Sequence, residues 1–508
     1  MWASGTCRYG GRLRETRLLC HFPDMTVSKH VDVLIIGAGI SGVDAVYRLK
    51  TRCPEKSLLI LEARERVGGT WDLFRYPGVR SDSDIFTLGF PFRPWPSDQA
   101  IVDGPAIRQY VEDTARETGV FEQIRFGQKV IRAGWSSADS RWTVETEDGE
   151  RFTAAFLYLA SGYYDYDQGY RPSWPGEEAF EGRIVHPQFW PEELDFAGKR
   201  VAVIGSGATA VTLVPALAGE AAQVTMVQRS PSYIVARPGR DAIARRLQRL
   251  LPKRAAGGLI RWKNILLTIY FYGRARRRPE RVSRWIREQV RKALPIGYPV
   301  ERDFTPSYKP WDQRLCLVPD GDLFAAIAGG KVSVATGAIE RFTRDGLRLA
   351  TGEEVRADVV VTATGLVMKV GGGIELSVDS KPVELPERFI YKGMMLSGVP
   401  NLFISFGYVN ASWTLRSDLT ARSVCRLLQH MDKRGFATVV ARADGGLERR
   451  PVIDFSSGYV QRAQDVLPSQ GDRQPWQVPQ NYLRDSLAMT FSRIDEALEF
   501  GAGPAAHA

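Results

Sequence analysis

The sequence predicts an α/β fold in which two similar βαβ units lie in one chain, the second inserted into the first. Three observations support this fold class. Each unit begins with an apolar run, a glycine-rich turn and a helical pattern. Each continues with a second short apolar strand, and each ends in a strand followed by small residues. The ranges are 31–49, 57–64 and 156–163 for the first unit, and 199–217, 223–230 and 358–366 for the second.

The nesting of the two units sets the predicted domain limits. The chain leaves the first unit near Ser161–Gly162 and returns to it near Thr364–Gly365. We therefore expect the first domain to comprise residues 25–163 and 366–508, and the second to comprise residues 164–365.

The first residues differ in composition from the rest of the chain. Residues 1–24 precede Met25 and lack an apolar signal region of about 7–15 residues. We expect a disordered tail or an over-called start, and an organelle transit peptide is the alternative.

The composition is that of a soluble globular protein, with 44% hydrophobic and 25% charged residues. No apolar run approaches the ~18 residues needed to span a bilayer. The five cysteines are scattered and never spaced C-x-x-C, which argues against a disulfide framework, a zinc site and a dithiol redox centre. The chain has only five histidines, so no metal is expected, and a reducing cytoplasmic compartment is the simplest interpretation.

One segment carries the positive charge of the chain. Residues 237–292 hold 18 arginines and lysines against three acidic residues, whereas the whole chain has a net charge of +10. Arg, Leu, Ile and Trp recur there at helical spacing, which predicts a helical insertion over 240–298. We interpret it as a solvated cap beside a phosphate site, or alternatively as a peripheral membrane contact. No nucleic-acid module accompanies the charge, so nucleic-acid binding is not expected.

The first glycine turn has the spacing of a dinucleotide site. Gly37 and Gly39 allow a tight turn and the approach of a pyrophosphate, and Gly42 allows the helix to pack on the strand. Glu62 ends the next strand, where a carboxylate can accept a hydrogen bond from a ribose hydroxyl. This unit is predicted to bind a dinucleotide without a 2′-phosphate, FAD. A purely structural turn is the alternative.

The second glycine turn points to a different dinucleotide. It reads Gly205, Gly207 and Ala210, and its next strand ends in Gln228 and Arg229 in place of an acid. A guanidinium suits a ribose with a 2′-phosphate, which predicts NADPH; solvation of a loop is the alternative for Arg229. Two such sites indicate hydride transfer from nicotinamide to flavin. Because no cysteine pair is present to accept the electrons, O2 is the leading acceptor.

Two long signatures give the chain a family resemblance. Residues 68–82, GGTWDLFRYPGVRSD, resemble the G-G-x-W-x-x-x-x-Y-P-G-x-x-x-D signature of Baeyer–Villiger monooxygenases. Residues 309–324 and 391–401 are most similar to the ethionamide-activating monooxygenase subgroup. The second long signature is residues 180–191. It is similar to the family fingerprint F-x-G-x-x-x-H-x-x-x-W-P, with Phe180, Gly182, His186, Trp190 and Pro191.

The resemblance implies an activity and two catalytic residues. NADPH would reduce FAD, O2 would form a C4a-peroxyflavin, and one oxygen atom would enter beside the carbonyl of a small hydrophobic ketone. The product would be an ester or lactone, with sulfide oxidation as a side activity. The catalytic arginine falls on Arg314, oriented by Asp82. The alternatives for these two residues are a surface ion pair and a helix N-cap.

Two other functions stay open at this point. One is N- or S-oxygenation by a flavin-containing monooxygenase, and the other is a non-catalytic NADP(H)-binding protein of the membrane surface. The oligomeric state is not fixed by the sequence.

The resemblance also implies further cofactor contacts. Many relatives have a lysine before the catalytic arginine that helps hold the NADPH phosphate, but Gln313 stands there, which leaves Arg229 as the main determinant. Trp71, Tyr76 and Trp413 are expected either to line the substrate cavity or to pack. The remaining predicted cofactor contacts are Ser41, Gly69, Thr70, Trp71, Asp82, Ala208, Thr209, Thr364 and Gly365.

The fingerprint histidine lies between the two glycine turns, where the chain crosses from the first unit to the second. Because oxygen insertion needs an arginine that stabilises charge more than a histidine base, we predict that His186 is a linker residue. It would couple the motion of the two domains, with Gly182 turning the chain and Trp190 anchoring it. A histidine that only packs the linker is the alternative.

Overall fold

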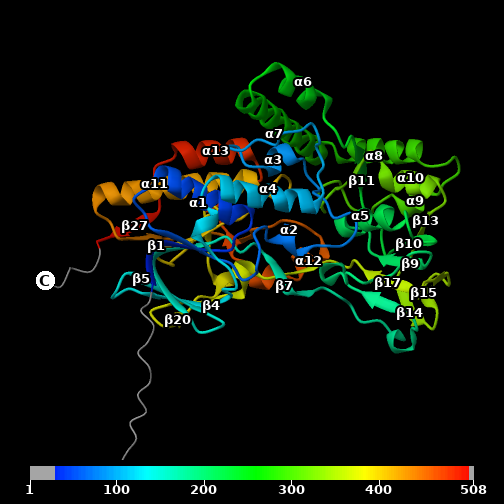
Figure 1. Ribbon diagram of the computed structural model, residues 1–508, viewed down its shortest axis with the longest axis horizontal. Coiled ribbons are helices and arrows are strands. Elements are labelled where there is room, and N and C mark those ends of the chain that lie inside the picture. Colours follow the sequence, from blue (N-terminus) through cyan, green and yellow to red (C-terminus); the bar gives the residue numbers. More distant parts are fainter. Residues whose placement is uncertain (1–28, 503–508) are drawn as a thin grey trace, which may run out of the picture.

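The computed structural model describes residues 29–502. Its two largest sheets, each flanked by helices, lie side by side along the long axis (Figure 1). The predicted α/β class with one unit inserted into the other is confirmed. The predictions for residues 1–24 concern a segment outside the described residues.

The larger sheet is built from both ends of the described chain. It has nine strands, in which parallel strands are extended by the antiparallel strands β4 and β5. The apolar run of β1 is buried from Val33 to Ile36, as expected for a parallel strand covered on both faces. The strands are β1 (Lys29–Ile36), β2 (Leu58–Leu61), β3 (Ile124–Arg125), β4 (Val130–Ser136), β5 (Arg141–Thr146), β6 (Arg151–Leu159), β19 (Glu375–Val378), β20 (Lys381–Pro382) and β23 (Leu402–Ile404).

Three long helices cover one face of this sheet (Figure 1). They are α1 (Ile40–Arg52), α4 (Gly104–Glu117) and α11 (Trp413–Arg434). α1 and α11 share one apolar core with the underlying strands, so the first and last parts of the described chain form a single domain. The segment after α1 contains two short helices, α2 (Thr70–Leu73) and α3 (Ile85–Leu88).

The second sheet lies between β6 and β19 in the sequence. Its five strands are all parallel, and their order is β13-β10-β9-β17-β8. A three-stranded antiparallel meander packs beside it. The elements are β8 (Arg183–Val185), β9 (Arg200–Ile204), α5 (Ala208–Leu217), β10 (Gln223–Gln228), α10 (Asp322–Ala328), β13 (Val332–Thr336), β14 (Ile339–Thr343), β15 (Gly346–Leu349), β16 (Glu354–Arg356) and β17 (Val359–Thr362).

Two paired strands connect the sheets. The chain leaves the first sheet through β7 (Tyr164–Gly169) and returns through β18 (Leu366–Met368), and these strands pair antiparallel. The predicted domain limits, after residues 163 and 365, fall directly before these two strands and stay predictions.

The basic segment forms three helices, as the spacing of its apolar residues predicts. They are α6 (Ala242–Leu250), α7 (Lys253–Arg277) and α8 (Pro279–Ala293). Asp241 caps α6 by accepting from the backbone of Ile243 and Ala244. Pro252 and Pro279 stand at the starts of α7 and α8, where a missing N–H costs nothing. Within residues 29–502, no helix combines the length and apolarity needed to cross a bilayer.

A buried ion pair fixes the last helix of the chain. Arg416 on α11 and Asp485 on α13 (Tyr482–Phe491) are 1% and 2% exposed and form a salt bridge. Arg416 Nη2 donates to the Lys392 carbonyl oxygen at 2.7 Å, and the Tyr408 hydroxyl donates to Asp485 Oδ2 at 2.5 Å. The pair and its partners therefore hold α13 against α11.

We expect Asp485→Asn to destabilise the protein by about 3–5 kcal/mol, because it leaves the Arg416 charge buried without its counter-ion. The unfolding transition of the purified protein measures this loss. Asp495→Asn is the control, since its ion pair with Arg493 is exposed, and it should leave the transition unchanged. Equal transitions for Asp485→Asn and the wild type would contradict the role given to the pair.

Candidate active site

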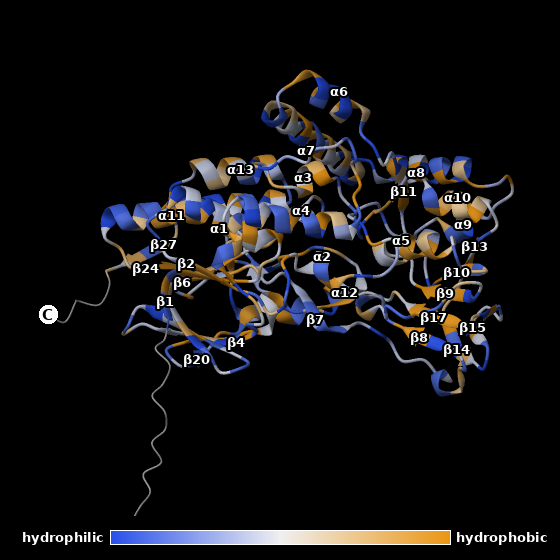
Figure 2. Ribbon diagram, viewed as in Figure 1, coloured by the Kyte–Doolittle hydropathy of each residue, from blue (hydrophilic) through white to orange (hydrophobic). Residues whose placement is uncertain are grey.

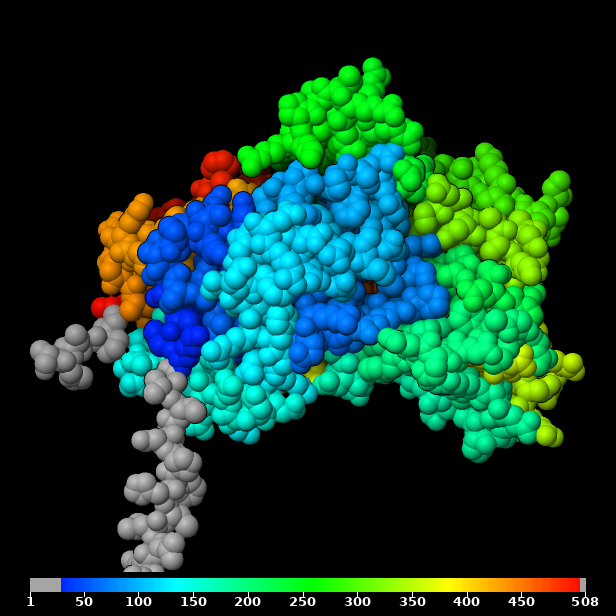
Figure 3. All heavy atoms as spheres, in the orientation of Figure 1, coloured from blue at the N-terminus to red at the C-terminus, as the bar shows by residue number. Residues whose placement is uncertain are grey.

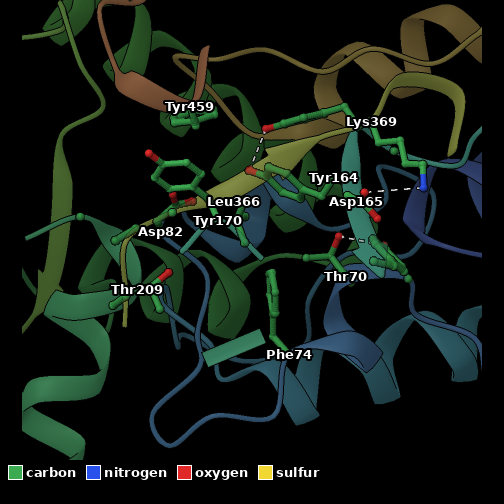
Figure 4. A pocket seen from close by; sticks show the side chains of 18 of the residues that line it. Thr70, Phe74, Asp82, Tyr164, Asp165, Tyr170, Thr209, Leu366, Lys369 and Tyr459 are labelled. Atoms are coloured by element: carbon green, nitrogen blue, oxygen red, sulfur yellow. Dashed lines mark hydrogen bonds and ion pairs between the residues drawn. The ribbon is translucent and has the colours of Figure 1, made fainter. Parts of the chain in front are cut away.

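A cavity of about 1080 Å³ lies between the two glycine turns and is lined by residues of both units (Figure 4). It exceeds the roughly 300–1,000 Å³ that is usual for a pocket holding one small molecule. Most of the predicted site residues line it. They are Gly37, Gly39, Ser41, Glu62, Gly69, Thr70, Trp71, Asp82, Gly205, Gly207, Ala208, Thr209, Arg229, Arg314, Thr364 and Gly365.

The first glycine turn has the geometry that its spacing predicts. Gly37 has a φ of +102°, and a Cβ there would stand 2.9 Å from the carbonyl oxygen of Ala160. A Cβ on Gly42 would stand 1.9 Å from the Gly37 carbonyl oxygen, so Gly42 serves helix packing and does not line the cavity. Gly39 is the N-cap of α1 and offers no side-chain cap, which leaves the N–H groups of the first turn available to a ligand.

The second turn repeats this arrangement. Gly205 has a φ of +134°, and its Cβ would stand 2.3 Å from the Ala363 carbonyl oxygen. Gly207 is the N-cap of α5 and offers no side-chain cap, and open space surrounds the position where its Cβ would lie. Ala210 is fully buried in the packing position and does not line the cavity.

Glu62 holds the first turn in place as well as facing the cavity. Its Oε2 accepts from the Ala38 N–H at 2.6 Å, and its Oε1 accepts from the Arg64 N–H at 2.9 Å. Burial raises the pKa of Glu62, and these backbone hydrogen bonds oppose the shift. A carboxylate with two such bonds keeps lone pairs for a ribose hydroxyl.

The side chains of Gln228, the last residue of β10, and of Arg229, which follows it, point in different directions. Arg229 is exposed at the cavity wall. The Gln228 side chain points into the domain, where its Nε2 donates to the Asp303 carbonyl oxygen at 2.8 Å and to Thr336 Oγ1 at 3.0 Å. Gln228 therefore does not line the cavity, because side chains that are neighbours along a strand alternate in direction and Gln228 is the residue that turns inward.

Arg314 and Asp82 form a two-point ion pair in the cavity wall. Arg314 Nε lies 2.9 Å from Asp82 Oδ2, and Nη2 donates to Oδ1 at 3.2 Å. Burial disfavours the guanidinium charge, but the Asp82 carboxylate and the neighbouring tyrosines raise the pKa of Arg314 above its ordinary value. Asp84, and not Asp82, caps α3 by accepting from the Thr87 N–H, so the alternative of an N-cap does not apply to Asp82.

Aromatic side chains surround the ion pair. Tyr163 stacks on Trp413 with ring centroids 4.9 Å apart, and its hydroxyl lies 3.0 Å from that of Tyr164. Burial raises the pKa of Tyr163 and Tyr164, so both remain neutral phenols. Of the two interpretations for Trp71, Tyr76 and Trp413, lining the cavity holds for all three, and Tyr76 also packs in the core of the second unit.

The fingerprint residues lie outside the cavity wall. Phe180 packs edge-on against Phe342, and a Cβ on Gly182 would stand 2.5 Å from the Asp358 carbonyl oxygen. Gly182 therefore permits a close contact with the segment that precedes β17. Trp190 packs edge-on against Phe196, and Pro191 follows it.

His186 packs against the strands that connect the two sheets. A Cβ on Gly169, the last residue of β7, would overlap the His186 ring. His186 Nδ1 accepts from the Gln188 N–H at 3.2 Å, and Gln188 Nε2 donates to the Asp165 carbonyl oxygen at 2.8 Å. Burial lowers the pKa of His186, while the backbone of Gly365 and Tyr170 opposes the shift. The ring is therefore a neutral group that contacts Gly169 at the end of β7 and lies near the backbone of Gly365, directly before β18.

Several residues of the cavity wall carried no prediction. Tyr163, Tyr164 and Tyr166 follow the small residues at the end of β6, so the aromatic run after that strand was a usable signal. Lys369, which lies 3.6 Å from Asp165 Oδ2 (Figure 4), and Arg462 come from segments without a motif. Cys316 also lines the cavity, but burial raises the pKa of its thiol to about 12, which keeps it protonated.

The basic helices take no part in the cavity. None of the residues 240–298 lines it, so the interpretation of this segment as a cap beside a phosphate site is not supported. Among residues 29–502, no group of three or more His, Cys, Asp or Glu side chains could hold a metal ion.

Comparison with known proteins places the chain among flavin monooxygenases. A family model described as "Flavin-binding monooxygenase-like" matches residues 28–395. The FAD-containing monooxygenase EthA of Mycobacterium tuberculosis is 53% identical over 485 residues, which cover 94% of this chain and 99% of that protein. The probable FAD-binding monooxygenase AlmA of Acinetobacter is 45% identical over 482 residues, covering 93% and 97%.

Solved structures share the fold. A steroid monooxygenase bound to NADP superposes with a TM-score of 0.74 at 22% identity and covers 94% of this chain and 100% of its own. An open form of cyclohexanone monooxygenase has a TM-score of 0.72 at 20% identity with the same coverage. The chain belongs to the flavin-binding monooxygenase-like family.

Proposed function

We propose that this flavin-dependent monooxygenase uses FAD and NADPH to insert one oxygen atom of O2 beside the carbonyl of a small hydrophobic ketone. The product is an ester or lactone. The Arg314–Asp82 pair between the two glycine turns carries the proposal, because oxygen insertion at a ketone places negative charge on the carbonyl oxygen, and a fixed guanidinium stabilises such charge. Oxygen transfer to a sulfide or amine develops no such anion on the substrate.

The first glycine turn fits the pyrophosphate of FAD. Gly39, Ile40 and Ser41 line the cavity at the uncapped start of α1, where free N–H groups and the helix dipole favour phosphate. A Cβ on Gly69 would stand 3.2 Å from Gly39 Cα, so this second glycine lets the loop before α2 close over the turn. Glu62 would accept from the ribose.

The second turn fits NADPH. Gly207, Ala208 and Thr209 line the cavity at the uncapped start of α5. Arg229 makes no ion pair or side-chain hydrogen bond with any of the residues 29–502, so its charge is available to a 2′-phosphate.

The chain supplies charge and position to the reaction. FAD, when bound, provides the redox chemistry and the activation of O2. Asp82 engages only part of the N–H groups of Arg314 and fixes the plane of the guanidinium by its two-point contact, so other N–H groups remain for an oxygen atom of the substrate. Tyr163, Tyr164 and Tyr459 lie near the guanidinium, and the pair itself faces the cavity with side chains that are 33% and 30% exposed.

A product panel tests the proposed reaction. Purified protein, NADPH and O2 are combined with ketones, sulfides and amines, and the products are identified. An ester or lactone carrying one labelled atom from ¹⁸O2 is the expected outcome, with sulfoxide as a minor product. Brisk oxidation of sulfides or amines without ester from any ketone would establish the N- or S-oxygenating alternative. Failure to oxidise NADPH with FAD bound would establish the non-catalytic one.

Arg314→Ala should lower ester formation by at least about 10²-fold, the loss usual for one charge-stabilising donor, while bound FAD is retained. Product formation per enzyme measures this loss. Arg276→Ala is the matched control, because Arg276 also pairs with an aspartate, Asp312 at 2.9 Å, but does not line the cavity. Undiminished ester formation by Arg314→Ala would remove Arg314 from the catalytic site.

Arg229→Ala should raise the KM for NADPH by about 10–100-fold, the equivalent of one charge-assisted hydrogen bond, and leave the KM for NADH unchanged. Steady-state kinetics with both cofactors separate the two effects. Gln313→Lys, which restores the residue common among relatives, should lower the KM for NADPH. An equal rise for both cofactors in Arg229→Ala would contradict a contact with the 2′-phosphate.

His186→Gln tests the linker role that we propose for this residue. We expect FAD content and flavin reduction by NADPH to be retained, while the fraction of oxidised NADPH that yields product falls about twofold or more, since the domains move less in concert. His430→Gln on α11 is the control. A lower thermal midpoint with an unchanged product fraction would show that His186 only packs the linker.

A further inference from the structure

The α6–α7 helix pair exposes a stripe of large apolar side chains. It stands above the neighbouring surface as a ridge (Figure 3), and apolar and charged residues alternate along it (Figure 2). In α7, positions 259, 262, 266 and 270 follow the spacing of one helix face. The exposed fractions range from 37% to 67% for Ile243, Leu250, Leu259, Trp262, Leu266, Leu267, Tyr270 and Phe271.

The opposite face of α7 is firmly held by the protein. Ile260, Asn264 and Ile265 are buried, and Arg261 Nη1 donates to the carbonyl oxygens of Phe86 at 3.0 Å and Gly89 at 2.6 Å. One face of α7 therefore packs on the protein, and the apolar stripe lies on the face that is exposed to solvent.

Unpaired basic side chains surround the stripe. Asp241, directly before α6, forms a salt bridge with Lys263 and caps α6, so it does not neutralise these basic side chains. No ion pair or side-chain hydrogen bond within residues 29–502 engages the exposed Arg246, Arg249, Lys253, Arg254, Arg274 and Arg277. Apolar side chains flanked by free arginines are typical of helices that lie in the interface of an anionic bilayer.

We infer that the α6–α7 face docks on the surface of an anionic lipid bilayer, with the apolar stripe in the headgroup region and the arginines on lipid phosphates. Charge selects this partner over a second copy of the chain. A two-fold contact through this face would bring the same unpaired arginines of both copies together, which like-charge repulsion opposes. A lipid phosphate neutralises them.

The docked face would lie close to the cavity. Ala256 and Ile260 of α7 share an apolar cluster with Leu88 and Trp71, and Leu88 and Trp71 line the cavity. One layer of side chains therefore lies between α7 and this part of the cavity wall, although docking itself does not depend on the reaction.

Vesicle flotation of the purified FAD-loaded protein tests the inference. We expect the protein to float with vesicles of phosphatidylcholine and phosphatidylglycerol and not with phosphatidylcholine alone. Arg246→Glu with Arg249→Glu should reduce the bound fraction at least about tenfold. Leu266→Glu with Tyr270→Glu should reduce it similarly. NADPH oxidation in buffer should stay at the wild-type level in both variants, which shows that they are folded.

The controls carry the same changes elsewhere on the surface. Val466→Glu places a charge on an apolar side chain that is 45% exposed, and Lys331→Glu with Lys381→Glu reverses two exposed charges. Both should bind vesicles like the wild type. Absence of wild-type binding, or equal binding by the helix variants, would overturn the inference. A third outcome would also overturn it: a wild-type dimer in ultracentrifugation that does not bind vesicles and that Leu266→Glu with Tyr270→Glu dissociates.

Discussion

The site depends on one constraint: the carboxyl ends of the parallel strands of both large sheets must open onto the same cavity. The antiparallel pairing of β7 with β18 meets it, because it joins the sheets at the points where the chain leaves the first unit and returns to it. Within each unit, a close contact between the first glycine of the turn and the residue after a neighbouring strand then sets the position of the turn. Gly37 lies against Ala160 and Gly205 lies against Ala363, each at the end of the strand that closes its unit. A side chain at either glycine would push the turn away from its sheet.

The charged pair in the cavity wall is a product of this apposition. Asp82 lies between α2 and α3 of the first unit, whereas Arg314 follows the basic helices of the second unit. Their two-point contact therefore crosses from one unit to the other. The guanidinium is positioned only while the units face each other. His186, which packs against the end of β7 and near the backbone before β18, is well placed to link that geometry to domain movement.

The basic side chains discussed above lie in two separate environments. Arg229 and Arg314 stand in the cavity wall. Arg314 pairs with Asp82, whereas Arg229 has no acidic partner among residues 29–502, and this difference determines what each can bind. The arginines of α6 and α7 lie outside the cavity beside exposed Leu, Trp, Tyr and Phe side chains. In the functions that we propose, the same residue type serves ligand recognition in one place and attraction to a charged surface in the other, and the neighbouring side chains decide which.

Local sequence determined the parts whose chemistry is local. The glycine turns, the flanking apolar strands, Glu62 and the basic helices follow from steric freedom, burial and periodicity within a few residues, and all were predictable. The pairing of Arg314 with Asp82 was named from a resemblance, but its geometry, the inward turn of Gln228 and the use of Asp84 as the helix cap were settled only by the fold. Lys369 and Arg462 enter the cavity from distant segments with no motif. Such contacts arise from the packing of two sheets against each other, and no local pattern specifies which side chains a long-range apposition will bring together.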